Sequence, residues 1–346
     1  MNIRITLFIL TIGLLATVKA ADSSAVDYEV KVSKILMGTV VETTALYPDI
    51  AYCKQSLFKA YKEMERVENL LSYQKMGSEI TKINVEAGKN PVHVSAETFG
   101  ILQRAAGYAK KLNGLFDVTI GPVSSLWGFS SPEGGHLPGK TEILSKLTKV
   151  GISDLVLNEK DTTVFLKQEG MMLDLGGIAK GYAIDRGSAV LKESGITNFI
   201  LNAGGDMYVS GQKDDEIPWK VGVKDPRHGQ ELIARFNLKD YAVATSGDYE
   251  RFIIVDDKRY CHIFDPRTGY PGNQSQSSTT FASTAEEADV LATYLFLIGA
   301  PEAFKENFSR PFFIVDSDGR QFANEPFKNL PGLQSDKEAI SDPEIN

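Results

Sequence analysis

The residues best suited to chemistry lie in an apolar stretch near the C-terminus. Asp289 and Thr293 are four residues apart, so a helix would place both on one face. The surrounding segment 288–298 is almost entirely apolar, which predicts a buried helix. A buried carboxylate must be paired or must bind a cation, and carboxylate and hydroxyl oxygens suit Mg²⁺. The pattern favours a Mg²⁺ site over the alternative, a carboxylate held by a nearby amide or arginine.

A candidate base follows an apolar segment earlier in the chain. His262 is one of four histidines and precedes a dense polar turn, 265–269. An imidazole can accept a proton near neutral pH, so this histidine could be a general base. The alternative is a ring bonded to a backbone carbonyl, beside a structural ion pair of Asp265 and Arg267. The other histidines lie in polar, turn-like stretches and are expected at the surface: His93, His136 and His228.

Three glycine-containing stretches could bind phosphate. In 174–181, a predicted strand ends at two glycines and a helix begins with Lys180 in its first turn. Free amides at a helix start attract anions, so this is either a phosphate site or a structural strand–turn–helix junction. The segment 202–206 holds a second glycine pair, and 243–249 combines Thr, Ser and Gly; each alone is typical of a bend or turn. Two such turns on neighbouring strands would form a cradle of backbone amides.

The elements that must position these residues can be read from periodicity and turn signals. Helices are predicted over 49–71, 95–114, 178–194 and 285–298. Strands are predicted over 30–45, with a bulge or close backbone approach at 37–39, and over 155–166 as a hairpin, 173–175, 199–201, 219–223, 232–237, 251–255, 260–264 and 312–315. Because the strands come in pairs, we expect an α+β fold with mixed or antiparallel sheets and flanking helices.

Composition excludes several classes of protein. The chain has 346 residues with 37 Lys+Arg, 45 Asp+Glu and a formal net charge of −8, which argues against a nucleic-acid binder. With 42% hydrophobic and 24% charged residues, most of the chain is expected to be globular. The two cysteines, Cys53 and Cys261, cannot make a disulfide framework or a thiolate zinc site, although they could pair in an oxidising compartment.

The first twenty residues have the pattern of a secretory signal. Arg4 precedes an apolar run, and small residues lie where a signal peptidase would cleave. An uncleaved anchor is the alternative, but the run is shorter than the ~20 residues of a spanning helix. We therefore predict a signal peptide over 1–20, a single domain over 21–330 and a flexible tail over 331–346, in an exported protein.

Taken in order along the chain, these motifs resemble those of the FAD:protein FMN transferases, the ApbE-type flavin transferases. The resemblance rests on the five stretches above and runs from about residue 35 to residue 300. Further matching motifs are Met37-Gly-Thr, Ser72-Tyr73, the segment from Phe116 to Pro122 and the segment from Leu126 to Phe129. Each motif alone is weak, but eight in the expected order make a chance match improbable.

The resemblance implies a fold, an activity and partners. Members have an α+β, T-fold-related architecture and depend on Mg²⁺. They split FAD, transfer its FMN half to a Thr or Ser hydroxyl of another protein, and release AMP. The implied partners are FAD and acceptor proteins with an FMN-binding domain, such as respiratory electron-transfer subunits, with membrane association only through those complexes. The implied location is the bacterial periplasm. This chain differs from many members in lacking the cysteine of a lipid anchor.

The same resemblance implies roles for individual residues. For FAD, the implied contacts are Met37, Tyr73, Leu115, Phe116, Asp117, Asp174, Lys180 and Ile263. For Mg²⁺, the implied ligands are the side chains of Asp289 and Thr293 and the backbone carbonyls of Gly177 and Ala292. His262 matches the histidine expected to act as the base.

Three other activities would use a similar cleft. An FAD pyrophosphatase would direct water instead of a hydroxyl at the same phosphate. An exported FAD-binding oxidoreductase or carrier would retain the flavin and would need no metal beside it. A non-catalytic assembly protein for a respiratory complex would do neither. The chain contains no segment that resembles the family's acceptor motif, so we do not expect it to flavinylate itself.

Overall fold

The computed structural model describes residues 27–131, 133–213, 217–229 and 231–335. The predicted signal peptide, 1–20, and the last eleven residues of the predicted tail lie outside the described residues. No helix in the described part of the chain is long and apolar enough to cross a membrane. Cys53 and Cys261 are both buried and are not joined in a disulfide.

The centre of the fold is an eight-stranded sheet in which every neighbouring pair is antiparallel. Its strands, in spatial order, are β1 (Tyr28–Leu36), β2 (Thr39–Tyr47), β6 (Asn198–Ala203), β7 (Asp206–Ser210), β10 (Tyr241–Gly247), β13 (Ser275–Ala282), β14 (Phe312–Asp316) and β15 (Gln321–Ala323). Together with the helices described below, this sheet confirms the predicted α+β class.

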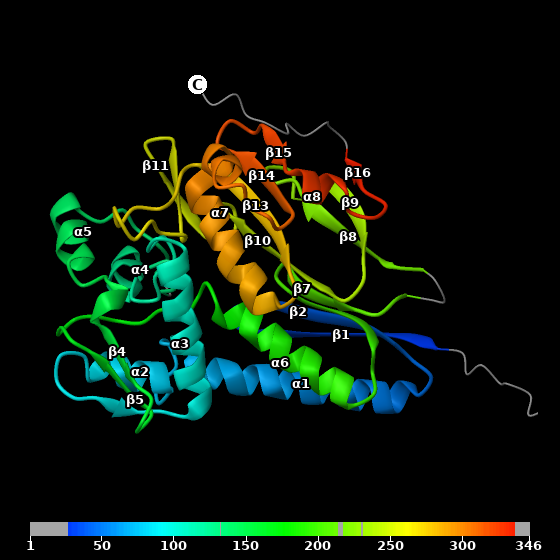
Figure 1. Ribbon diagram of the computed structural model, residues 1–346, viewed down its shortest axis with the longest axis horizontal. Helices are drawn as coiled ribbons and strands as arrows, with labels where there is room; N and C mark the ends of the chain where they lie inside the picture. Colours follow the sequence, from blue (N-terminus) through cyan, green and yellow to red (C-terminus); the bar gives the residue numbers. More distant parts are fainter. Residues whose placement is uncertain (1–26, 132, 214–216, 230, 336–346) are drawn as a thin grey trace, which may run out of the picture.

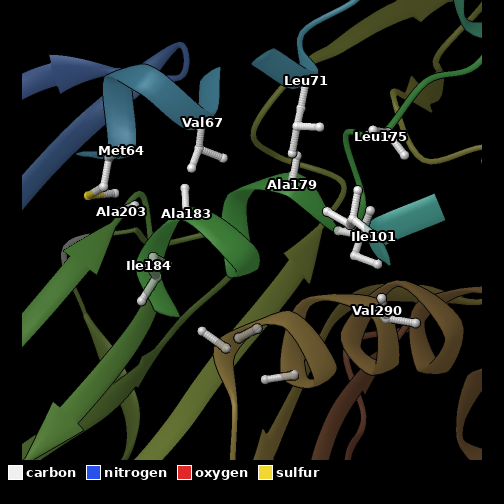
Figure 2. Close-up of a cluster of buried hydrophobic side chains, with 14 of the residues drawn as sticks. Met64, Val67, Leu71, Ile101, Leu175, Ala179, Ala183, Ile184, Ala203 and Val290 are labelled. Carbon is white, nitrogen blue, oxygen red and sulfur yellow. The ribbon is translucent and has the colours of Figure 1, made fainter. Parts of the chain in front are cut away.

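Helices cover one face of this sheet (Figure 1). The long ones are α1 (Ile50–Leu71), α3 (Ala96–Lys111), α6 (Ala179–Glu193) and α7 (Ala285–Lys305). The short ones are α2 (Glu79–Val85), α4 (Gly121–Trp127), α5 (Lys140–Leu147) and a 3₁₀ turn (Ile152–Asp154). A further short helix, α8 (Glu325–Lys328), packs on the opposite face through Phe327. Figure 2 shows Met64 and Val67 of α1 facing Ala183 of α6, with Val290 of α7 in the same cluster. The small residues on α6 let these helices pack closely.

A second, smaller sheet covers the opposite face. It consists of β8 (Trp219–Lys224), β9 (Leu232–Leu238) and β16 (Gln334–Ser335). Its aromatic side chains pack against the central sheet, with the ring centroids of Phe236 and Phe281 5.1 Å apart. Two further sheets lie to the side: β3 (Val92–His93), β4 (Leu155–Asn158) and β5 (Thr163–Leu166) form one, and the hairpin of β11 (Phe252–Val255) and β12 (Lys258–Cys261) forms the other.

Most predicted helices match the structure, and their boundaries have clear causes. The side chains of Asp49, Ser95 and Thr284 accept backbone N–H groups at the first turns of α1, α3 and α7. The helix predicted over 285–298 extends to Lys305, because a break at Gly299, with a φ of 73°, lets a second helical segment follow. His93, His136 and His228 are exposed, as predicted.

Three predictions about strands are wrong, and one long strand was missed. Residues 30–45 form two strands, because Met37 and Gly38 have φ angles of 52° and 72° and make a hairpin turn. Residues 173–175 form no strand; the ladder there is a single bridge between Met172 and Ile120. The stretch 243–249 is mostly strand β10 and not a turn, and β13 was not predicted at all. Both β10 and β13 carry hydroxyl side chains where an alternating apolar pattern is expected.

The predicted flexible tail begins too early. In the structure, the backbone N–H of Asn237 donates to the carbonyl of Pro331 over 2.8 Å. Gln334 and Ser335 then pair with β9, and Leu333 packs against the core beneath that strand. Residues 331–335 therefore belong to the folded domain, because they complete the edge of the small sheet.

Candidate active site

The predicted site residues converge on one cleft with a volume of about 440 Å³. The cleft lies between the hairpin turn after β1, the loop after α1, the N-terminus of α6 and the middle of α7. The site residues that line it are Met37, Tyr73, Leu115, Phe116, Asp117, Asp174, Gly177, Lys180, His262, Ile263, Asp289 and Thr293. Ala292 is the exception: its backbone carbonyl accepts a hydrogen bond from Ser278 Oγ over 2.7 Å.

The close contact of α6 with α7 positions Asp289. A Cβ at Gly181 would collide with the backbone carbonyl of Ala285, so the two helices can approach this closely only with glycine there. The backbone N–H of Gly181 donates to Asp289 Oδ2 over 3.0 Å. Asp185 of α6 accepts the N–H groups of Ala285 and Glu286 at the start of α7. The register between the helices is therefore held at two points.

The donor set around Asp289 suits a hard cation. Asp289 is 5% exposed, and its Oδ1 has no hydrogen-bond partner among the described residues. Thr293 Oγ1 lies one helical turn away and shares a hydrogen bond of 3.4 Å with Ser246 Oγ. Gly177 approaches closely: a Cβ there would lie 3.4 Å from Thr293 Oγ1. Burial raises the pKa of Asp289, and the charge of Lys180 opposes that rise. A buried carboxylate with an unused oxygen beside a hydroxyl fits Mg²⁺.

Lys180 projects from the first turn of α6 and makes a short ion pair with Asp206. Asp206 follows the second glycine pair, Gly204-Gly205, and is 1% exposed. Its other carboxylate oxygen accepts the backbone N–H of Thr245 over 3.0 Å. The Lys180–Asp206 pair thus links the stretches 174–181 and 202–206. The bond from Thr245 to Asp206 links the stretch 243–249 to both.

The two acidic residues implied for FAD binding differ in their surroundings. Asp174 accepts Ser124 Oγ over 2.7 Å and the backbone N–H of Gly176 over 2.9 Å, so it shapes the glycine turn that lines the cleft. Asp117 accepts two bonds from Thr119 and the backbone N–H of Ile152, so its carboxylate joins its own loop to the 3₁₀ turn. Burial raises the pKa of Asp117, and these hydrogen bonds oppose that rise.

His262 lies directly after β12 and lines the cleft. Its Nδ1 is buried and has no hydrogen-bond partner among the described residues. Burial of the ring, followed by the charges of Arg251 and Lys180, lowers the pKa of His262 to about 3. The ring is therefore neutral over the physiological range and can accept a proton or a hydrogen bond.

The structural alternative for this turn holds only in part. Asp265 and Arg267 do form an ion pair, at 2.8 Å. Asp265 also accepts the backbone N–H of Arg267, and it is not part of the cleft wall. Within the described part of the chain, the His262 Nδ1 has no partner at ordinary hydrogen-bond geometry, although the Arg251 backbone lies near enough to the ring to oppose the fall in its pKa. The ion pair therefore shapes the turn, while the imidazole is left for the cleft.

Three residues at or behind the cleft wall were not assigned roles from the sequence. Asp206 is identifiable by its place directly after a glycine pair. Ser278 is hidden in β13, whose polar sequence masks a buried strand. Arg251 lines the cleft beside His262, but an arginine at the start of a strand is usual on any protein surface, so its sequence position carries no signal.

The sequence pattern that defines the ApbE family matches residues 37–308, a range that includes the whole cleft wall. This chain belongs to the ApbE family. The FAD:protein FMN transferase of Klebsiella pneumoniae (strain 342) is 34% identical over 271 residues, which cover 77% of this chain and 82% of the relative. The FAD:protein FMN transferase of Vibrio cholerae serotype O1 is 30% identical over 313 residues, covering 87% and 92%.

The likeness to ApbE proteins extends to the three-dimensional fold. The crystal structure of the ApbE protein from Thermotoga maritima superposes on this chain with a TM-score of 0.79 at 34% identity. The superposition covers 88% of this chain and 99% of that one. The ApbE resemblance found in the motifs is therefore confirmed for the fold and for most of the chain.

Proposed function

We propose that this ApbE-family protein is a Mg²⁺-dependent FAD:protein FMN transferase, which moves FMN from FAD to a Thr or Ser hydroxyl of an acceptor protein. The transfer activity is the one named for its relatives. One observation carries the proposal: a single cleft brings together a buried Asp beside a half-buried Thr, a lysine among glycine amides, and a histidine whose ring is neutral.

The cleft offers FAD two kinds of surface. Met37, Tyr73 and Phe116 line it with flexible apolar and aromatic side chains, which suit the flat isoalloxazine ring. The turn at Gly176-Gly177 and the Lys180 ammonium provide backbone and positive charge for the pyrophosphate. Flavin and phosphate recognition can therefore occur in adjoining parts of the same cleft.

Asp289 and Thr293 would hold Mg²⁺, together with the backbone carbonyl of Gly177. The Ala292 carbonyl, which already accepts Ser278 Oγ, would have to contribute through its second lone pair. Bound there, the ion would shield phosphate charge and thereby favour attack on phosphorus. The protein's part is to hold Asp289 in place through the Gly181 N–H and to keep Lys180 paired with Asp206 until a phosphate is bound.

The transfer itself requires a proton acceptor. The acceptor hydroxyl attacks the phosphorus of the FMN half, forming a phosphate ester to the protein. The bond between that phosphorus and the bridging oxygen breaks, and its electron pair leaves with AMP. His262 would take the hydroxyl proton, because its ring is neutral and lines the cleft. Positioning and charge stabilisation supply most of the rate in such reactions.

The proposal includes the cellular setting. The N-terminal pattern supports export to the bacterial periplasm, and the acceptors would be FMN-binding domains, such as those of respiratory electron-transfer proteins. Labelling the N-terminus of the secreted protein would test whether cleavage occurs near residue 20.

One assay tests the function directly. The purified protein is incubated with FAD, Mg²⁺ and an FMN-acceptor domain, and the products are AMP and a covalently flavinylated acceptor in equal amounts. An acceptor with its target Thr replaced by Ala is the control and must stay unmodified. Free FMN with AMP would instead identify a pyrophosphatase. Retained flavin without AMP would identify a carrier, and no flavin binding would leave only an assembly role.

A further inference from the structure

Arg251 occupies a special place at the base of the β11–β12 hairpin. It lines the cleft together with its neighbour Glu250 and with Ser130 from the loop after α4. Its backbone carbonyl accepts the backbone N–H of His262 over 3.1 Å, across the base of the hairpin. The hairpin therefore places the Arg251 side chain and the His262 ring at the same part of the cleft.

The guanidinium of Arg251 has no acidic partner in the described residues. Its one hydrogen bond joins Nη1 to Ser130 Oγ over 3.0 Å, and a hydroxyl does not neutralise its charge. Other cations around the site are paired: Lys180 with Asp206, Arg227 and Arg259 with Asp248, and Arg267 with Asp265. A guanidinium has five N–H donors, so most of those of Arg251 remain available.

The charge of Arg251 reaches the candidate base. After burial, it is the largest influence that keeps the His262 ring neutral, ahead of Lys180. An unpaired guanidinium close to an imidazole in a cleft that also contains Lys180 suits a ligand with several negative oxygens. Arg recognises phosphate well, because its planar fork donates two parallel hydrogen bonds.

We propose that Arg251 binds a phosphate of the dinucleotide at the mouth of the cleft and stabilises the charge that develops on the departing AMP phosphate. This inference rests on the proposed function. When the bridging P–O bond breaks, the electron pair moves onto the AMP phosphate, and the guanidinium is positioned to accept that charge. A guanidinium engaged by phosphate also ceases to oppose protonation of His262, so binding of the substrate would make the base more effective.

Binding titrations separate phosphate recognition from general damage. FAD, FMN and riboflavin share the flavin ring but carry two, one and no phosphates. For Arg251→Gln, we expect FAD affinity to fall about 10–100-fold, the range for a hydrogen bond to a charged group, with riboflavin affinity unchanged. Arg251→Lys should recover part of the loss, since it keeps the charge but not the fork.

A matched control lies on the same hairpin. Arg259 stacks on Phe252 at 3.7 Å and does not line the cleft, so Arg259→Gln should leave all three affinities unchanged. An equal loss for all three flavins in Arg251→Gln would overturn the proposal, as it would mean a distorted cleft. Unchanged FAD affinity with a raised KM for the acceptor would also overturn it, by assigning Arg251 to the acceptor protein.

The binding experiment also separates this inference from the function on which it rests. A wild-type protein that binds FAD through Arg251 but forms no flavinylated acceptor would refute the transferase function. The phosphate contact would then still stand, because it is measured without turnover.

Discussion

The two faces of the central sheet are built on different principles. Beneath the small sheet, Phe236, Phe281 and Phe327 interlock, with ring centroids 5.1–6.0 Å apart. Beneath α6 and α7, the contact depends on glycine and on polar groups that satisfy one another, such as the Gly181 N–H and Asp289. Apolar side chains alone hold the first face together, whereas the second adds buried polar groups to a large apolar core, and such groups cost free energy unless they are paired. Chemistry is therefore concentrated on the face whose core also contains paired polar groups.

The largest loss of activity without a matching loss of stability is expected at His262. Replacing it with Ala should reduce FMN transfer by about 10²–10⁴-fold, the range for a positioned base, while FAD affinity stays near normal. The free energy of unfolding should fall by less than in the Phe281→Ala variant described below, because the half-buried ring loses packing contacts but Nδ1 makes no hydrogen bond that would be lost. Steady-state kinetics and thermal melts of the same variant test both statements, with the exposed His228→Ala as control.

The pH profile gives the same histidine a second test. The protonated ring cannot accept a proton, and its pKa of about 3 lies below the ordinary 6.5. In the free enzyme the ring therefore stays neutral until the pH falls toward 3, so kcat/KM should show no acid limb from His262 near pH 6.5. A limb near 6.5 that disappears in His262→Ala would show that the ring is far less buried in solution.

The aromatic face should respond in the opposite way. Phe281 is fully buried against Phe236 and Phe327, so Phe281→Ala should lower the free energy of unfolding by about 3–5 kcal/mol. At a temperature where this variant is folded, FAD affinity and transfer should be close to wild type. Denaturant melts measure the first effect; a large loss of FAD affinity in the folded variant would mean that the faces are coupled.

The helical face should gain stability from a cation, and the aromatic face should not. Mg²⁺ at about 100 times its Kd should raise the free energy of unfolding by about 2.7 kcal/mol. Asp289→Ala should abolish that gain, because its unused carboxylate oxygen is removed. Thermal melts with and without Mg²⁺ measure it, and Phe281→Ala should retain the full Mg²⁺ increment. A Mg²⁺ increment that persists in Asp289→Ala would locate the ion elsewhere.

The smallest expected effect concerns the clamp between α6 and α7. Burial raises the pKa of Asp185 from 3.8 to about 6, despite the N–H groups of Ala285 and Glu286. Because the folded pKa lies above the ordinary one, the contribution of this group to stability is complete below about pH 4 and is lost as pH rises through about 6. Asp185→Asn should flatten the stability profile between those values. An unchanged profile in urea melts would mean that another group titrates there.

The same contrast explains what sequence reasoning could reach. Regular apolar spacing predicts α1 and α7, and paired strands predict an antiparallel α+β fold. Asp289 and Thr293 were identifiable because polar residues are conspicuous on an apolar helix. β13 was not, because its serines and threonines meet polar partners on α7 and β10, such as the carbonyl of Ala292, and so lack an apolar alternation. The pairing of Lys180 with Asp206 joins residues 26 positions apart and becomes visible only in three dimensions.

The two contacts between α6 and α7 also have a mechanical consequence. Two helices in contact at a single point can still rotate or slide against each other. The Gly181–Asp289 bond and the Asp185 contacts at the start of α7 join these helices at separate points. We therefore expect α6 and α7 to move as one rigid unit. The part of the cleft wall that they form should keep its shape with and without a ligand. Any movement that accompanies FAD binding is therefore expected in cleft-lining segments outside this helix pair, the base of the β11–β12 hairpin and the turn at Met37. Amide hydrogen exchange measured with and without FAD would test this. Exchange in α6 and α7 should be slow in both cases, and slowing on FAD binding should be confined to the β11–β12 hairpin and the β1–β2 turn.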